Sequence, residues 1–282
     1  MAPLPATPEP APQPRPARTR VKICGVRTPG LAAAAVDAGA DALGLVFAPR
    51  SPRRLTVEQA RAVLHAVGPF VETVGLFVEP ADNLRRHALQ ALDFSMLQLH
   101  GELAPQDLPA LAAQLGPRRI LKPLAFNDPR QFADDLARWA PLIHPRHGPH
   151  GSEDHADHAD QADQADHAAG RPDGPRPDDQ APDPSPRCAV VGLLVDAPDP
   201  SGVGGGAGRT FDWHALRHAL DALGPPAPPI VLAGGLNPEN VADAVRAVRP
   251  SAVDVSSGVE VRRGQKDPAM VRAFCQAVQS VD

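Results

Sequence analysis

The chain has 282 residues, of which 43% are hydrophobic and 22% are charged, with 35 prolines and a formal net charge of −5. This composition excludes a short disulfide scaffold, a collagen-like repeat and a wholly disordered acidic chain. Two stretches, residues 1–19 and 144–186, are poor in large apolar residues. The remainder, about 220 residues, is enough for one hydrophobic core at the low end of the size of an α/β barrel.

We predict that both stretches are disordered. Residues 1–19 form a Pro-rich tail, and residues 144–186 contain no Val, Ile, Leu, Met, Phe, Trp or Cys. Such segments cannot bury enough apolar surface to become ordered. The second stretch carries ten acidic residues against three arginines, and six of the eleven histidines lie within 144–167. A metal site there is conceivable, but the spacing matches no structural site, and we interpret the segment as a solvated linker.

The charge and cysteine content bear on partners and location. Outside residues 144–186 the net charge is slightly positive, which suits the binding of an anionic metabolite. The sequence shows no basic face large enough to predict nucleic-acid binding. Cys24, Cys188 and Cys275 are widely spaced without a CxxC motif, which favours a reducing, cytoplasmic location. No apolar run reaches the roughly 18–20 residues of a membrane span, and the N-terminus lacks the apolar region of a signal peptide.

Short apolar runs alternate with helical patterns along the rest of the chain, as expected for strands buried on both faces. The runs cover residues 21–24, 42–47, 71–77, 96–100, 120–124, 190–196, 230–233 and 252–255. Thr56 and Gln59 predict a capping box, and Asn237 before Pro238 predicts an N-cap followed by the first helical residue. The helical spacing of Val241, Ala244, Val245 and Val248 predicts one buried stripe.

Eight strands, each followed by a helix, predict a single (βα)8 TIM barrel over residues 20–282, interrupted by the 144–186 insertion before the sixth strand. An open doubly wound sheet is the alternative. No strong GxGxxG motif follows the first strand to favour that alternative.

Two strand ends deliver groups that could transfer protons. In a barrel the active site forms at the carboxyl ends of the strands. Lys22 and Cys24 share one face of the first strand, where the lysine could lower the pKa of the thiol; a buried structural cysteine is the alternative. Asp196 closes the sixth strand as a candidate acid or a loop anchor. A thiol and a carboxyl group on different strands could act as base and acid.

Other loops at the same rim could bind anions. Arg50, Arg53 and Arg54 offer guanidinium groups that match a carboxylate, unless they only form a solvated basic loop. The last two strands are followed by small-residue turns, at the loops where barrels often bind phosphate. These turns contain Gly234, Gly235, Ser256, Ser257 and Gly258. Their glycines could also serve turn geometry alone. The glycines of 204–208 suggest a mobile lid or a simple flexible connection.

These motifs in this order resemble the phosphoribosylanthranilate isomerase family of tryptophan biosynthesis. The matching segments are 21–25, 39–47, 51–54, 97–101, 209–213, 234–240 and 254–260. They span essentially all of the patterned residues, whereas the tail and the 144–186 insertion lie outside the resemblance. The lid departs from the family pattern, because it is longer and ends in Gly-Arg where relatives often have Gly-Lys.

The resemblance implies an Amadori rearrangement of N-(5-phosphoribosyl)anthranilate, an aminoaldose, to the aminoketose 1-(2-carboxyphenylamino)-1-deoxyribulose 5-phosphate, without cofactor or metal. It implies that Cys24 is the general base and Asp196 the general acid. It further implies that Arg53 holds the anthranilate carboxylate, with Arg54 one place away as the alternative, and that Asp254 lies near the substrate. The phosphate is expected on backbone amides near Gly235 and near Ser257 and Gly258.

Other functions remain possible on the residues alone. One is another sugar-phosphate barrel, such as the histidine-pathway aminoaldose isomerase, which usually has an aspartate where this chain has Cys24, or indole-glycerol-phosphate synthase. A non-enzymatic barrel or a protein that binds metal through its His/Asp-rich segment is a third. The sequence leaves open whether the protein is a monomer or a homodimer.

Overall fold

The structure is a computed structural model of the 282-residue chain, and it describes residues 18–78, 82–116, 118–143, 189–197, 210–224 and 227–281. The predicted disordered insertion, most of the predicted tail, Cys188 and the predicted lid glycines therefore lie outside the described residues.

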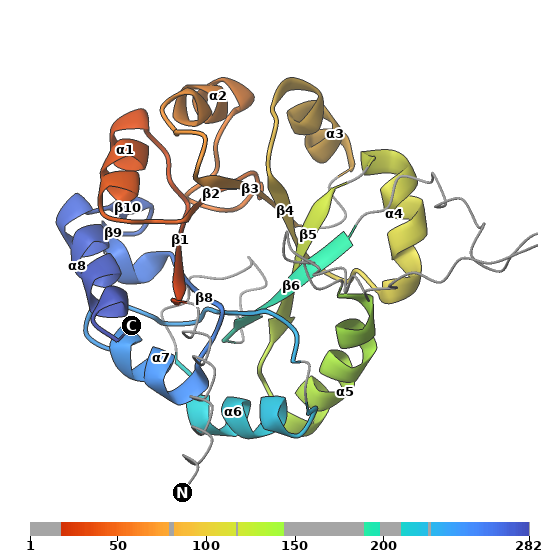
Figure 1. The fold of residues 1–282 in the computed structure, drawn as a ribbon. Coiled ribbons are helices and arrows are strands. Elements are labelled where there is room, and N and C mark those ends of the chain that lie inside the picture. Colours follow the sequence, from red (N-terminus) through yellow and green to blue (C-terminus); the bar gives the residue numbers. More distant parts are fainter. Residues whose placement is uncertain are drawn as a thin grey trace, which may run out of the picture.

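Within the described residues, eight parallel strands close into a barrel in the order β1 to β8, and eight α-helices surround it (Figure 1). The strands are β1 Arg20–Cys24, β2 Ala42–Val46, β3 Glu72–Val78, β4 Met96–His100, β5 Arg119–Ala125, β6 Ala189–Asp196, β7 Ile230–Leu232 and β8 Ala252–Val255. The helices are α1 Pro29–Asp37, α2 Val57–His65, α3 Asp82–Ala91, α4 Leu108–Leu115, α5 Pro129–Trp139, α6 Trp213–Asp221, α7 Val241–Val248 and α8 Pro268–Gln279. A small antiparallel hairpin, β9 Glu260–Arg262 with β10 Gln265–Lys266, follows β8.

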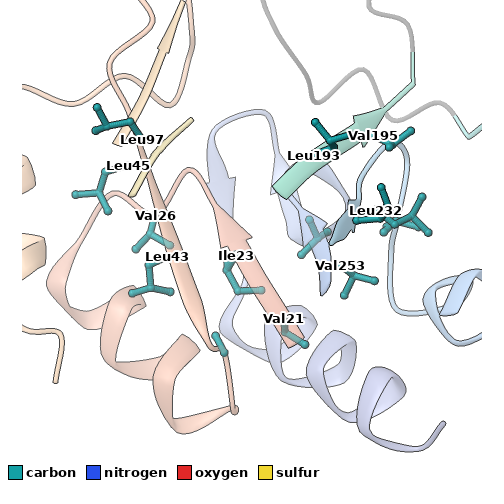
Figure 2. Packing of buried hydrophobic residues seen from close by; sticks show 14 of the residues in the cluster. Val21, Ile23, Val26, Leu43, Leu45, Leu97, Leu193, Val195, Leu232 and Val253 are labelled. Carbon is teal, nitrogen blue, oxygen red and sulfur yellow. The ribbon is translucent and has the colours of Figure 1, made fainter. Parts of the chain in front are cut away.

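The predicted (βα)8 barrel is confirmed, and each predicted strand agrees with the observed one to within one residue at either end. The reason is the two-sided burial of the strands. The outward face of β1 contributes Val21 and Ile23, which are 1% and 0% exposed and pack with residues such as Leu43 and Val253 of the neighbouring strands (Figure 2). Because side chains alternate along a strand, Lys22 and Cys24 face the barrel interior.

The helix starts agree with the sequence in one of the two cases that were predicted. At α2 the Thr56 hydroxyl accepts a hydrogen bond from the Gln59 backbone N–H at 3.2 Å, and the Gln59 side chain accepts one from the Thr56 N–H at 2.9 Å, which is the predicted capping box. The prediction for Asn237 was wrong, because α7 begins at Val241. The Asn237 side chain accepts hydrogen bonds from the N–H groups of Glu239 and Asn240, and so closes a turn before the helix.

Ile143 and Ala189, which flank residues 144–188 in the sequence, both lie at the amino-terminal face of the barrel. Ile143 forms a bridge with Val190, and β6 starts at Ala189, so the chain leaves and re-enters at the amino end of that strand. At the same face the described chain begins with Arg18, which pairs with Asp41, and with Thr19, which is 6% exposed. In the described part of the chain no helix is both long and apolar enough to cross a membrane.

Candidate active site

A cavity opens at the carboxyl ends of the strands and encloses about 560 Å³ of space, part of which is open to solvent. Every strand of the barrel except β5 contributes a side chain or its following turn to the wall. The lining residues are Cys24, Val46, Ser51, Arg53, Leu76, Gln98, His100, Asp196, Ala233, Gly234, Gly235, Leu236, Asp254, Val255, Ser256 and Ser257. The structure thus brings all predicted site residues except Gly258 to one wall.

Cys24 lies above Lys22 on the inward face of β1. The Lys22 ammonium donates a hydrogen bond to Asp254 Oδ1 of β8 at 2.9 Å, and both side chains are less than one-tenth exposed. Gly44 of β2 leaves room for them, because a Cβ at that position would lie 3.0 Å from Cys24 Sγ and 3.2 Å from Lys22 Nζ. A larger residue at position 44 would press on both functional groups.

The expectation that Lys22 lowers the pKa of the Cys24 thiol is wrong, because the pKa is raised overall even though the Lys22 charge acts to lower it. Burial raises the pKa of Cys24 and outweighs the opposite effect of the Lys22 charge, while Asp254 raises the pKa further. For Lys22 itself, burial acts to lower the pKa, but Asp254 and Cys24 raise it overall. The lysine therefore stays charged and is the strongest group favouring a thiolate, in a pocket that otherwise disfavours one.

Asp196 reaches the cavity at the end of β6, next to the turn that follows β7. Gly234 and Gly235 have φ values of 86° and 64°, a backbone region that favours glycine. A Cβ on Gly234 would lie 2.6 Å from the Ala197 backbone nitrogen and 3.2 Å from Asp196 Oδ1. Glycine at this position lets the β7 turn lie directly against the carboxyl group.

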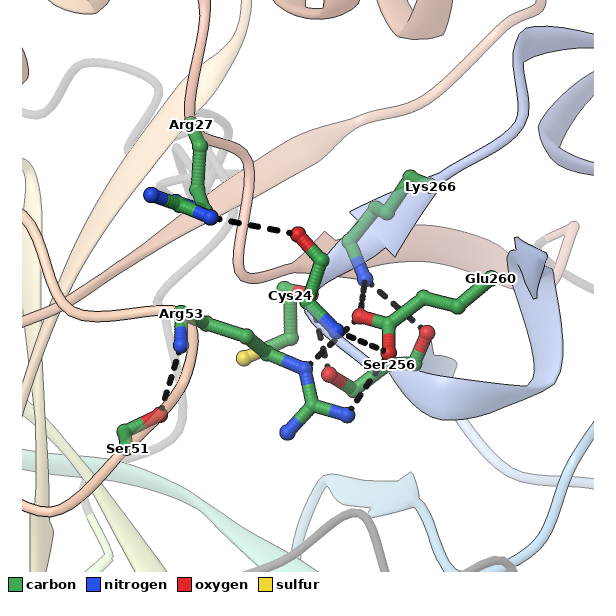
Figure 3. A network of polar contacts seen from close by, with 8 residues as sticks. Cys24, Arg27, Ser51, Arg53, Ser256, Glu260 and Lys266 are labelled. Carbon is green, nitrogen blue, oxygen red and sulfur yellow. Dashed lines mark hydrogen bonds and ion pairs between the residues drawn. The ribbon is translucent and has the colours of Figure 1, made fainter. Parts of the chain in front are cut away.

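Arg53 is held in a buried ionic network that includes the hairpin after β8 (Figure 3). Its Nε and Nη2 donate to the two oxygens of Glu260 at 2.7 and 3.0 Å, and Lys266 Nζ donates to Glu260 Oε1 at 3.0 Å. Burial acts to raise the pKa of Glu260, but the bonds from Arg53 and the charge of Lys266 lower it to about 2. This arrangement leaves Nη1 of Arg53 as the guanidinium nitrogen not bound to Glu260.

Arg53 is distinguished from its two neighbours by burial. It is 5% exposed and lines the cavity, whereas Arg50 and Arg54 are exposed and do not. Arg54 instead forms a bridge with Val46 through its backbone. The geometry therefore favours position 53 over position 54 as the cavity arginine.

Gly258 serves the packing of two loops. A Cβ at this position would lie 1.8 Å from the backbone oxygen of Leu236, so the turn after β8 and the turn after β7 approach each other only because residue 258 is glycine. Ser256 Oγ donates a hydrogen bond to the backbone oxygen of Cys24 at 3.1 Å and ties the same turn to β1. Gly258 does not itself line the cavity.

Sequence reasoning missed several polar residues of the site. Gln98 and His100 alternate with Leu97 and Leu99 along β4, a period-two pattern that could have indicated a polar inward face. Glu260 and Lys266 carry no comparable signal, because their roles depend on Arg53, about 200 residues away. Among the described residues no group of three or more His, Cys, Asp or Glu is placed to hold a metal ion.

A closed (βα)8 barrel whose cavity, at the carboxyl ends of the strands, brings together a thiol, a carboxyl group, a buried arginine and a glycine turn has the arrangement of a barrel enzyme. Comparison with known proteins narrows this class. The pattern of the family described as N-(5'-phosphoribosyl)anthranilate (PRA) isomerase matches residues 21–169 and 176–277. The matched ranges extend into the 144–186 segment, which the resemblance had left out.

Individual relatives agree with the family match. An N-(5'-phosphoribosyl)anthranilate isomerase of Pseudomonas fluorescens is 37% identical over 92% of this chain and 95% of its own. One of Thiobacillus denitrificans is 39% identical over 90% of this chain and 95% of its own. The crystal structure of the Thermotoga maritima enzyme matches with a TM-score of 0.66 at 29% identity, covering 93% of this chain and 99% of that one. The chain belongs to the N-(5'-phosphoribosyl)anthranilate isomerase family.

Proposed function

We propose that the protein is a phosphoribosylanthranilate isomerase that converts the aminoaldose N-(5-phosphoribosyl)anthranilate to the aminoketose 1-(2-carboxyphenylamino)-1-deoxyribulose 5-phosphate in tryptophan biosynthesis. The observation that carries the proposal is the convergence of Cys24 of β1 and Asp196 of β6 on one cavity. Family membership supports it, as does a relative solved in complex with reduced 1-(o-carboxyphenylamino)-1-deoxyribulose 5-phosphate, with a TM-score of 0.64 and 27% identity.

The reaction needs one proton donor and one proton acceptor. Asp196 in its protonated form delivers a proton to the ring oxygen, the bond between that oxygen and C1 breaks, and the open sugar carries an imine at C1. Cys24 as a thiolate removes the proton from C2, giving an enolamine that tautomerises to the ketone. C1 is reduced and C2 is oxidised within the same molecule, so the step is an aldose–ketose isomerisation that needs no external oxidant.

The charged groups of the pocket determine how the two ends of the substrate bind. Arg53 directs the nitrogen that Glu260 leaves unused toward the substrate carboxylate, since a guanidinium fork matches a carboxylate. Backbone N–H groups near Gly235 and Ser257 bind the phosphate, because a glycine turn lets an anion approach the main chain. Asp254, fixed by Lys22, lines the same cavity, and we expect the sugar to bind beside it.

Location and assembly are expectations of the same proposal. We place the enzyme in the cytoplasm as a monomer or homodimer. The Thermotoga maritima relative is described as dimeric.

Lys22 is the group that favours the thiolate of Cys24, so its positive charge supports the form of Cys24 that accepts a proton.

The test follows the decay of phosphoribosylanthranilate fluorescence after addition of the protein. Cys24→Ser and Asp196→Asn should each lower kcat by about 10²- to 10⁴-fold, because each removes one proton-transfer group. Circular dichroism and thermal unfolding check that both variants fold. Full activity in either variant contradicts the role given to that residue, and no decay with the unchanged protein contradicts the proposed function.

A further inference from the structure

We propose that Gln98 and His100 are an uncharged pair that binds hydroxyl groups of the ligand's sugar chain, with Gln98 accepting a hydrogen bond and His100 donating one. The inference rests on the proposed function, because it assigns part of the same cavity to part of the same substrate. It adds two binding residues on β4, a strand to which the functional assignment gives no other role.

The two side chains form a fixed unit in the cavity wall. Both point inward from β4 and line the cavity with Cys24 and Asp196. Gln98 is 2% exposed, and its Nε2 lies 2.7 Å from Nε2 of His100. A contact of this length is a hydrogen bond, so one of the two nitrogens donates and the other accepts.

The protonation state of His100 sets the direction of this bond. Burial, together with the charges of Lys22 on β1 and Lys122 on β5, lowers the pKa of His100 to about 4. The imidazole is therefore neutral near pH 7 and has one donor nitrogen and one acceptor nitrogen. Since the Gln98 amide donates to Nε2, the proton of His100 resides on Nδ1, which is left to donate to a ligand.

Gln98 is left with an unused acceptor. Its Oε1 is buried, and no hydrogen-bond partner for it exists among the described residues. A buried polar atom without a partner costs free energy, so such an atom in the wall of a binding cavity points to a ligand group that satisfies it. Because a carbonyl oxygen only accepts, that group has to bring a hydrogen, which excludes a carboxylate or a phosphate oxygen without a proton.

The division of the cavity by charge leaves the sugar chain to this pair. Arg53 and the glycine turns account for the two anionic ends of the substrate, and Cys24 with Asp196 accounts for the reacting carbons. The sugar hydroxyls both donate and accept, and they fit one acceptor and one donor without net charge. Hydroxyl recognition by neutral groups also adds discrimination against analogues that lack the hydroxyl.

The test measures binding of two probes by calorimetry. The first is reduced 1-(o-carboxyphenylamino)-1-deoxyribulose 5-phosphate, and the second has the same carboxyphenylamine joined to a five-carbon phosphate chain without hydroxyls. Gln98→Leu should weaken the first probe by roughly 10- to 100-fold and leave the second nearly unchanged, because only the first brings hydroxyl donors to Oε1, whereas both probes carry the same anilino N–H. Equal weakening of both probes, or of neither, overturns the inference.

His100 provides a second pair of variants that does not depend on Gln98→Leu folding. His100→Asn keeps an amide donor near the place of Nδ1, whereas His100→Leu removes it. The asparagine variant should therefore bind the hydroxylated probe more tightly than the leucine variant, with no such difference for the probe without hydroxyls. Matching affinities of the two variants for the hydroxylated probe contradict a donor role.

A nitrogen NMR spectrum of the unchanged protein separates this inference from the proposed function. At pH 7 His100 should be neutral with its proton on Nδ1, and an imidazolium or a proton on Nε2 overturns the assignment. If the unchanged protein binds neither probe and does not consume phosphoribosylanthranilate, the proposed function fails. If it binds and turns over but the Gln98 and His100 variants behave like it, only the further inference fails.

Discussion

Glu260 contacts two cations at once, Arg53 and Lys266, with its side chain only 3% exposed. It lines no part of the cavity, but it fixes the guanidinium that does. Removing one partner from a buried ion pair leaves the other charge buried without compensation, and this strongly destabilises the folded state. The role proposed for Arg53 therefore depends on the Glu260 carboxylate, which does not line the cavity.

Glu260 should make folding stability sensitive to acid. Its pKa is lowered from 4.5 to about 2, so its contribution, on the order of 3 kcal/mol, is present above about pH 5 and is lost as the pH falls toward 2. In Glu260→Gln the free energy of unfolding should be lower near pH 7 and vary less between pH 5 and 3. Urea unfolding at several pH values measures this.

The matched control for Glu260 is Asp243→Asn. Asp243 is also paired with an arginine, but its side chain is 74% exposed, and surface pairs contribute about 0–1 kcal/mol. Its substitution should leave the pH dependence of unfolding unchanged. The same acid sensitivity in Glu260→Gln as in the unchanged protein contradicts the assignment.

The sequence was enough to place Cys24, the proposed base, in the barrel interior but not to predict the direction of its pKa shift. Alternation along β1 was enough to turn Lys22 and Cys24 into the barrel. The pKa of the thiol depends on how completely the closed barrel excludes water and on the Asp254 carboxylate beside Lys22. Neither can be inferred from the sequence around Cys24. The prediction of a thiolate next to Lys22 was therefore wrong, and the structure shows a buried thiol with a raised pKa.

At the scale of elements, the turns after β7 and β8 work as one unit because Gly258 lets them touch. Gly258→Ala should force the Leu236 backbone away, since the added carbon would lie 1.8 Å from its oxygen. We expect weaker binding of the reduced product analogue, a lower melting temperature, or both. Calorimetry and thermal unfolding measure the two effects.

Gly30→Ala in α1 is the control for that substitution. A Cβ at Gly30 meets no atom within 4 Å, and alanine within a helix is favoured over glycine by roughly 0.5–1 kcal/mol. This variant should be as stable as the unchanged protein or more so, with binding unaffected. Unchanged binding and stability in Gly258→Ala would show that the two turns can separate without consequence.

Strands and helix starts were predictable to different degrees. Most strands were found to within a residue because both of their faces are buried, which leaves a nearly continuous apolar run, whereas β4 alternates polar Gln98 and His100 with leucines. The start of α7 was misplaced because Asn237 and Asn240 are both good capping residues, and only the folded turn decides between them. In the structure the Asn240 amide donates to the Gly235 oxygen and ties the turn to the cavity wall.

At the scale of the whole molecule, the cavity and the residues that flank the long insertion lie at opposite ends of the barrel. Residues 144–188 connect at the amino end of β6, whereas Asp196 closes its carboxyl end. Deleting residues 145–186 should therefore leave kcat nearly unchanged. The fluorescence assay with the shortened chain measures this, and a large fall in kcat in a folded deletion variant contradicts the separation of the two ends.

The meeting of Cys24 and Asp196 was predictable, because it follows from strand order and from the rule that parallel barrel strands end at one rim. The ionic partners of Lys22 and Arg53 were not predictable from the sequence. Lys22 with Asp254 and Arg53 with Glu260 are separated by 232 and 207 residues, and many acidic residues could have filled either role. Only the closure of β8 against β1 selects them.

The Lys22–Asp254 pair joins the first strand of the barrel to the last. In the closed barrel the Lys22 ammonium is buried, and a buried charge is costly without a partner of opposite charge. The strand that closes the barrel therefore brings the carboxylate that the closure requires. The same strand and its following turn contribute Asp254, Ser256 and Ser257 to the cavity, so closing the barrel and completing the cavity wall depend on one segment.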